Sequence, residues 1–75
     1  MGSRPTTMQM TAVLSACAEG GFVAFNPETG TTTQGESADE ALANLKEATE
    51  LYLEESPNSV LGKAQITTFE VKAHA

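Results

Sequence analysis

The sequence is poor in aromatic residues, cysteine and long apolar runs. Four aromatic residues, none of them tryptophan, are present among 75, so small aliphatic side chains must form most of any core. A single cysteine, Cys17, excludes an internal disulfide. No apolar run approaches the ~20 residues of a membrane-spanning helix, and residues 1–10 lack the apolar stretch of a signal peptide. We therefore expect a soluble, cytoplasmic protein with no membrane partner.

Basic side chains are also scarce, with four lysines and arginines against ten acids and a net charge of −6. Binding to a nucleic-acid backbone requires Lys and Arg to neutralise phosphates, so direct nucleic-acid binding is not expected. The acidity instead favours attraction to basic partners. Because a chain of this length buries only ~60% of its unfolded surface, association would add stability. We expect a homo-oligomer, either a dimer or a tetramer.

Three short segments have the composition of β-strands. In residues 8–17, MQMTAVLSAC, methionine, alanine and leucine alternate with the other side chains, as in a half-buried strand. Residues 22–25, FVAF, are apolar on both faces, which is typical of a covered strand, and residues 31–34, TTTQ, are mostly β-branched. The turn sequences AEGG and NPETG join them. The tight connections predict an antiparallel meander of three strands.

A helix is predicted from Ala38 to about Glu55. Ser37 and Glu40 form a capping box, in which Ser37 accepts from the Glu40 amide and Glu40 reaches back to the Ser37 amide. Pro57 disfavours helical backbone at the residue before it and so ends the helix. The apolar stripe at helical spacing comprises Ala38, Ala41, Leu42, Leu45, Ala48, Thr49 and Tyr52, with Leu53 at its edge. We expect Leu42, Leu45 and Phe25 to be buried.

A fourth strand is predicted over residues 64–71, AQITTFEV. The order β-β-β-α-β belongs to the α+β class. Because crossover connections are right-handed, the fourth strand is expected to lie parallel to the first. The domain then spans residues 8–71, with residues 1–7 as a flexible lead-in and residues 72–75 as a tail.

Three acids, Glu36, Asp39 and Glu40, lie within five positions at the predicted start of the helix. A two-metal nuclease site needs carboxylates that converge from different elements. These three are neighbours in sequence, and capping and the helix dipole already account for two of them. We interpret the cluster as the junction between a strand and the helix. A metal-dependent nuclease using Glu19, Glu36 and Asp39 is the residual alternative.

Nucleophilic catalysis has little support in the sequence. The only histidine, His74, is the penultimate residue of the expected tail, where it cannot hold a fixed geometry against Cys17. Neither EGGF nor QGES matches a nucleotide-binding fingerprint. We expect no enzymatic activity, no catalytic residues, no metal and no cofactor.

The outward face of the predicted helix is acidic. Such a face is usually only solvated, but it also suits a basic partner that is steered by charge. Leu51 falls on this polar side and adds a weak indication of a contact surface. The candidate partner-binding residues are Glu28 in the second turn and Asp39, Glu47, Glu50, Leu51 and Glu54 on the helix. An uncovered edge strand is a second possible contact.

GGFVAFNPE, followed by TQGESADEALANLKEATELYLEE, resembles the HicB antitoxin family. The shared pattern is a Gly-Gly/aromatic hairpin, a Pro-Glu turn, a Thr-Gln-Gly strand end and a helix built on Glu-Ala-Leu, Asn and Lys-Glu-Ala, over about residues 8–71. The resemblance implies a partial ribonuclease H-like fold without recognisable nuclease acids. It also implies neutralisation of a small basic mRNA-cleaving toxin, HicA, by obstruction of its RNA-cleaving site, and frequent oligomerisation.

Two departures from the family pattern affect this expectation. The family turn usually reads like Pro-Glu-Leu-Pro-Gly-Cys, whereas this sequence has PETGTT. Many members carry a C-terminal DNA-binding domain, whereas this sequence ends at Ala75, so operator binding is not expected. Two hypotheses follow: an antitoxin that occludes a HicA-type toxin, or an orphan HicB-like domain that associates with itself and has no toxin.

Overall fold

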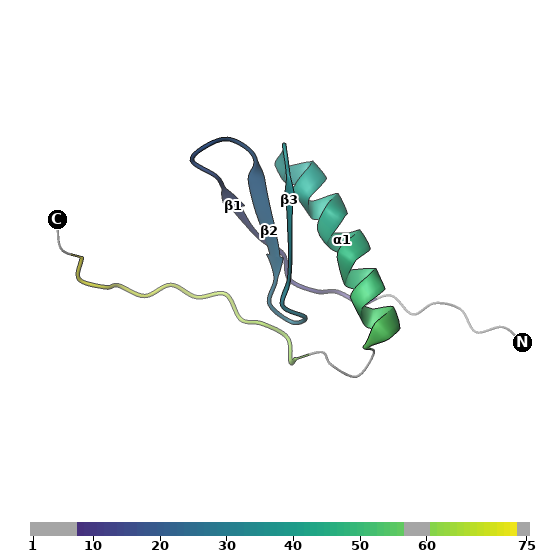
Figure 1. The fold of residues 1–75 in the computed structure, drawn as a ribbon. Helices are drawn as coiled ribbons and strands as arrows, with labels where there is room; N and C mark the ends of the chain where they lie inside the picture. The colour runs from purple at the N-terminus through teal and green to yellow at the C-terminus, as the bar shows by residue number, and fades with distance from the viewer. Residues whose placement is uncertain (1–7, 57–60, 74–75) are drawn as a thin grey trace, which may run out of the picture.

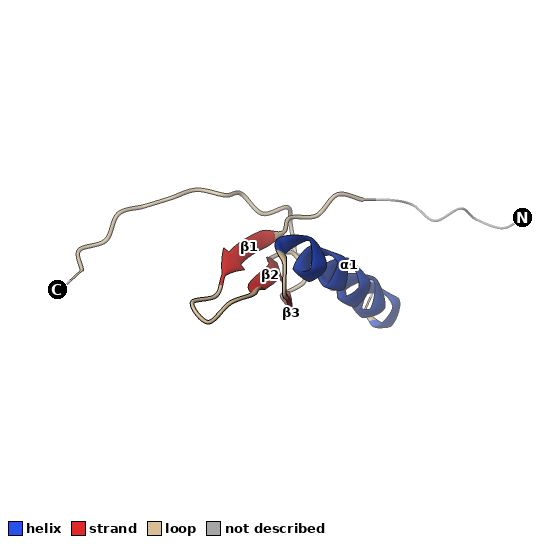
Figure 2. Cartoon of the chain, turned by 90° about the horizontal axis from the view of Figure 1, so that it is seen from above, coloured by secondary structure: helices blue, strands red, loops and turns tan. Residues whose placement is uncertain are grey.

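The computed structural model describes residues 8–56 and 61–73 and contains one antiparallel sheet and one helix (Figure 1). The elements are β1 (Val13–Ala16), β2 (Phe22–Asn26), β3 (Thr31–Gly35) and α1 (Ala38–Glu55). The strands lie in chain order, and each pairs antiparallel with the next. Seen from above, α1 lies on one side of the sheet (Figure 2). The predicted α+β class and three-stranded meander are confirmed.

The turns between strands use glycine where the backbone is left-handed. Gly20 and Gly21 close the β1–β2 connection with φ of 103° and 85°. The Cys17 amide donates to the Gly21 carbonyl at 2.9 Å, and the Gly20 amide donates to the Cys17 carbonyl at 3.0 Å. Positive φ carries little steric penalty only for glycine, so AEGG specifies this turn. β1 begins at Val13, five residues later than the first predicted strand.

The strand register decides which side chains face the helix. Ala24 pairs with Leu14 in β1 and with Thr33 in β3, so these three residues share the helix side of the sheet. Ala24 is fully buried there. Its neighbour Phe25 points to the opposite face, which α1 does not cover, and is 38% exposed. The expectation that Phe25 is buried is therefore wrong.

The core is small and centres on one row of the helix. Ala41, Leu45 and Thr49, spaced four apart, are the buried residues of α1, and Leu45 is only 3% exposed. This confirms the prediction for Leu45. Leu42 is 43% exposed, because α1 packs mainly against β3 and β2 and leaves the side toward β1 open. The prediction that Leu42 is buried is wrong.

The predicted helix start is confirmed at Ser37, with one change in the capping box. The Glu40 amide donates to Ser37 Oγ at 3.1 Å. The Glu40 carboxylate accepts from the amide of Glu36, not from that of Ser37 as predicted. The helix ends at Glu55, where the Ser56 amide donates to the Tyr52 carbonyl at 2.8 Å. Pro57, the predicted terminator, lies outside the described residues.

The structure does not show the predicted fourth strand over residues 64–71. Residues 61–73 are extended, form no ladder and run away from the sheet (Figure 1). A strand requires a hydrogen-bonding partner beside it, and local sequence pattern does not supply one. The predicted lead-in at residues 1–7, and residues 74–75 of the predicted tail, lie outside the described residues.

Candidate functional site

The outward face of α1 presents an acidic surface. Five of the six candidate residues lie on it and are exposed: Asp39, Glu47, Glu50, Leu51 and Glu54. The buried row through Leu45 fixes this orientation, because the 3.6-residue period turns these positions away from the sheet. The last turn of α1 contains no basic residue, so Glu54 lies unfavourably near the negative end of the helix dipole. We call these five residues the acidic helix surface.

Glu28, the sixth candidate, lies apart from that surface and is only 2% exposed. Its Oε1 accepts from the Thr11 amide at 2.7 Å. Its Oε2 accepts from the Thr11 hydroxyl at 2.6 Å and from the Ala64 amide at 2.8 Å. Both carboxylate oxygens are thus occupied within the chain. Glu28 has a structural role, and the interpretation of it as a partner-binding residue is not supported.

Asn26 positions Glu28 in the β2–β3 turn. Asn26 Oδ1 accepts from the Glu28 amide at 2.9 Å and from the Thr29 amide at 3.4 Å. The amide nitrogen of the same side chain donates to Thr49 Oγ1 and to Met10 Sδ, each at 3.3 Å. Asn26 is buried and thereby connects the turn to the helix and to the segment before β1. Buried polar groups require such partners, since an unpaired one is costly.

The pKa of Glu28 is lowered from its ordinary value of 4.5. The hydroxyl of Thr11 contributes most, followed by the amides of Thr11 and Ala64, and nearby Lys63 adds attraction. Burial acts in the opposite direction and does not outweigh them. Glu28 is therefore ionised at neutral pH and joins residues before β1 to residues after α1. We call these contacts the Glu28 clamp.

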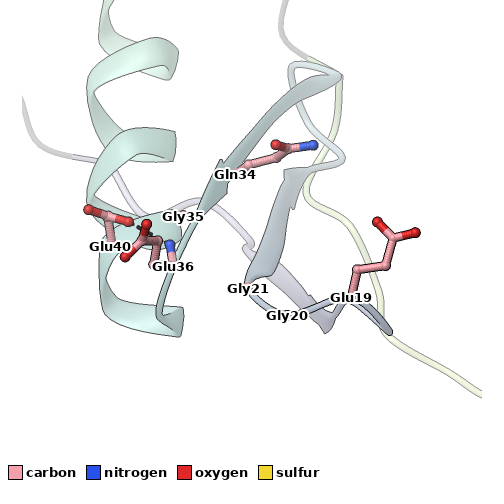
Figure 3. A pocket seen from close by; sticks show the side chains of 7 residues that line it. All are labelled: Glu19, Gly20, Gly21, Gln34, Gly35, Glu36 and Glu40. Carbon is pink, nitrogen blue, oxygen red and sulfur yellow. Dashed lines mark hydrogen bonds between the residues drawn. The ribbon is translucent and has the colours of Figure 1, made fainter.

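The acids of the nuclease alternative do not converge. A shallow polar depression is lined by Glu19, Gly20, Gly21, Gln34, Gly35, Glu36 and Glu40. In Figure 3, Glu40 turns toward Glu36, whereas Glu19 points away from both. Asp39 does not line this depression. Within residues 8–56 and 61–73, no three His, Cys, Asp or Glu side chains are grouped to hold a metal ion.

The structure does not give the geometry between Cys17 and His74. Cys17 is a half-buried free cysteine at the end of β1. His74 lies outside the described residues.

In the described part of the chain, no helix is long and apolar enough to cross a membrane.

An apolar groove separates α1 from the segment that leads into β1. Its walls are Met8, Met10, Thr11 and Ala12 on one side and Leu42, Leu45, Lys46, Thr49, Glu50 and Leu53 on the other, with Asn26 between them. The exposure of Leu42 follows from this groove, which α1 leaves uncovered. Sequence reasoning identified the alternation of Met8, Met10 and Ala12 but not the opening beside it.

Sequence reasoning missed three polar residues that organise this part of the molecule: Thr11, Asn26 and Thr49. Asn26 at the first position of a turn was a usable signal, because Asn there commonly accepts from amides two residues on. Thr49 within an apolar stripe was a second signal. Its buried hydroxyl had to find a partner, and Asn26 is that partner.

Comparison of this chain with models of protein families, with characterised proteins and with solved structures returns no match.

Proposed function

We propose that this chain is a non-enzymatic binding protein of the HicB antitoxin type. It binds a small basic toxin that cleaves mRNA and occludes the active site of that toxin. The proposed fold is a partial ribonuclease H-like fold whose fourth strand, at residues 64–71, lies parallel to β1 when it is formed. Support comes from the sequence pattern in residues 20–28 and 33–55 and from one observation above all, the acidic helix surface.

Charge is concentrated on the body of the molecule. Residues 8–56 contain nine acids and only one lysine, Lys46, for a net charge of −8. On the acidic helix surface, carboxylates replace the phosphates that an RNA-cleaving partner is built to bind. A cationic partner near Glu54 also relieves the repulsion between this carboxylate and the helix C-terminus. Leu51, 56% exposed among these acids, supplies an apolar contact within a charged surface.

The test begins with a pull-down at low salt, in which this chain captures its partners from the native organism. Measurements with the purified partner follow. We expect a small basic protein that cleaves RNA, and we expect cleavage to stop when this chain is added. Recovery of no small basic protein would contradict the proposal. A partner whose RNA cleavage continues in the complex would contradict the occlusion mechanism.

The binding surface is tested with two variants of equal net charge. Glu47→Gln with Glu50→Gln removes two carboxylates from the acidic helix surface, and Glu19→Gln with Glu36→Gln removes two exposed carboxylates elsewhere. We expect the helix variant to slow association and weaken its salt dependence, because charged groups at an interface mainly steer the encounter. Equal effects of the two variants would contradict this placement of the surface.

A second candidate function is self-association without a toxin. The observation that favours it is the extended segment 61–73, which exposes Leu61, Ile66, Phe69 and Val71. Large apolar side chains on an extended segment are typical of a surface that binds another chain. Light scattering on the full chain tests this candidate, and a strict monomer at high concentration would contradict it.

A further inference from the structure

The segment 61–73, which we call the C-terminal arm, has the character of a strand without a sheet. Side chains alternate along an extended chain, so Ile66 lies on one face and Phe69 and Val71 lie on the other. Phe69 is 84% exposed. A strand with large apolar side chains on both faces is stabilised by a position in a sheet that has apolar neighbours on both sides.

β1 offers such a position at its edge. Within the described residues β1 pairs only with β2, which leaves the other edge with unpaired backbone groups. On the helix side of this edge, Leu14 is 42% exposed. On the opposite side, Val13 and Phe25 are exposed. A strand added here would find apolar neighbours on both faces.

The Glu28 clamp places the root of the arm at the start of β1. One carboxylate holds both the Thr11 amide, two residues before β1, and the Ala64 amide. The Leu61 amide also donates to the Glu28 carbonyl at 2.8 Å. Two fixed amides within four residues set the direction in which the arm leaves, and that direction leads away from the sheet of the same chain (Figures 1 and 2).

We propose that the arm of one chain adds as a parallel strand to the free edge of β1 in a second copy, which returns its own arm in the same way. This proposal rests on the second candidate function, self-association. Within the described residues the arm forms no ladder with its own β1 and leaves that edge unpaired. A second copy receives the arm without any change at the clamp, and two-fold symmetry closes the exchange.

The distribution of charge between the arm and residues 8–56 also favours a second copy of this chain as the partner. The arm contains Lys63 and Lys72 against Glu70, for a net charge of +1, whereas residues 8–56 carry −8. Two such bodies repel each other, and the arm is the described segment of opposite sign. Its arrival at the body of the second copy therefore offsets part of the repulsion and favours this orientation of the dimer.

The first test is the mass of the full chain by light scattering across a range of concentrations. We expect a dimer whose dissociation constant rises about tenfold or more in Phe69→Glu, since the lost burial of one large apolar side chain corresponds to at least that factor. The matched control is Leu51→Glu, which places the same charge at an exposed leucine on α1 and should leave the dissociation constant within about twofold.

The second test distinguishes exchange from return to the same chain. Two samples of the Cys17→Ser chain are mixed. One carries a nitroxide at Thr68→Cys and no ¹⁵N, and the other carries ¹⁵N and no nitroxide. We expect broadening of the amides of Val13–Ala16 in the ¹⁵N-labelled chain, which only a neighbouring arm can cause. A third sample carries the nitroxide and ¹⁵N on the same chain. Broadening in this sample but not in the mixture would overturn the exchange.

The remaining outcomes separate the two claims. A monomer at all concentrations would overturn both self-association and the exchange. A dimer that Phe69→Glu leaves intact would overturn the exchange while self-association stands, because the copies then meet through another surface.

Discussion

The Ala64 amide nitrogen lies 2.8 Å from Glu28 Oε2, across 36 residues of chain. The same oxygen accepts from the hydroxyl of Thr11, so one carboxylate holds the segments on either side of the folded body. This contact gives the arm a fixed root although its later residues form no ladder. Glu28 is thus the residue through which the body and the arm are coupled.

The stability contributed by Glu28 should depend on pH. Its folded-state pKa lies below 4.5, so the contribution is fully present above that value and is lost as the pH falls through the lower folded-state pKa. We expect the melting temperature of the native chain to fall more steeply between about pH 5 and pH 3 than that of Glu28→Gln. The control is Glu36→Gln, at an exposed carboxylate. Identical slopes for native chain and Glu28→Gln would contradict the clamp.

Gly35 is required by the close approach of β3 to α1. A Cβ at this position would lie 2.4 Å from the Ala41 nitrogen and 2.8 Å from the Ala41 Cα, both backbone atoms. We expect Gly35→Ala to destabilise the fold by roughly 1–3 kcal/mol, as for other overpacked sites. Gly62→Ala is the matched control, because no atom lies within 4 Å of the added Cβ, and it should be nearly neutral. Urea melts measure both, and equal midpoints would refute the prediction.

Ser37→Ala should cost about 1 kcal/mol through loss of the bond that Ser37 Oγ accepts from the Glu40 amide. The measurement is again the free energy of unfolding in denaturant. Ser37→Asp is the useful comparison, since aspartate also caps helices and should restore most of the loss. If Ser37→Ala proved neutral, the side-chain cap would contribute nothing to the stability of α1.

Leu45→Ala and Leu42→Ala make the same chemical change at two depths. Leu45 is in the core, so its truncation should cost ~2–5 kcal/mol, a large part of the stability of a small domain. Leu42 is 43% exposed in the groove, and its truncation should cost roughly 1 kcal/mol or less. Comparable losses would mean that the groove beside Leu42 is filled in solution. An exchanged arm that reaches this groove would have that effect, so the pair should also be measured in the Phe69→Glu background.

Local pattern was sufficient for much of the fold. Gly20 and Gly21 specify a turn because other residues resist positive φ. Ser37 specifies the helix start because its side chain satisfies an amide that has no partner within the helix. Both effects act over a few residues, and both predictions were confirmed. The acidic helix surface followed in the same way, from helical period alone.

Burial and the role of Glu28 could not be predicted in that way. Alternation places Phe25 and Ala24 on opposite faces but does not say which face a single helix will cover. An acid in a turn is solvated by default, and only the approach of Thr11 and Ala64 makes Glu28 a buried acceptor. The predicted fourth strand is absent from the described residues for a related reason. A strand forms only where the edge of another strand lies beside it, and local pattern does not supply that edge.

The sequence by itself determined the α+β class, the order of three strands and a helix, the cap at Ser37 and the acidity of the outward helix surface, because each depends on contacts within a few residues. Tertiary structure alone decided that α1 leaves the β1 side open, that Glu28 is buried and that the C-terminal arm departs from the sheet. The burial of Glu28 and the root of the arm depend on contacts between residues 17 and 36 positions apart, which no local pattern encodes.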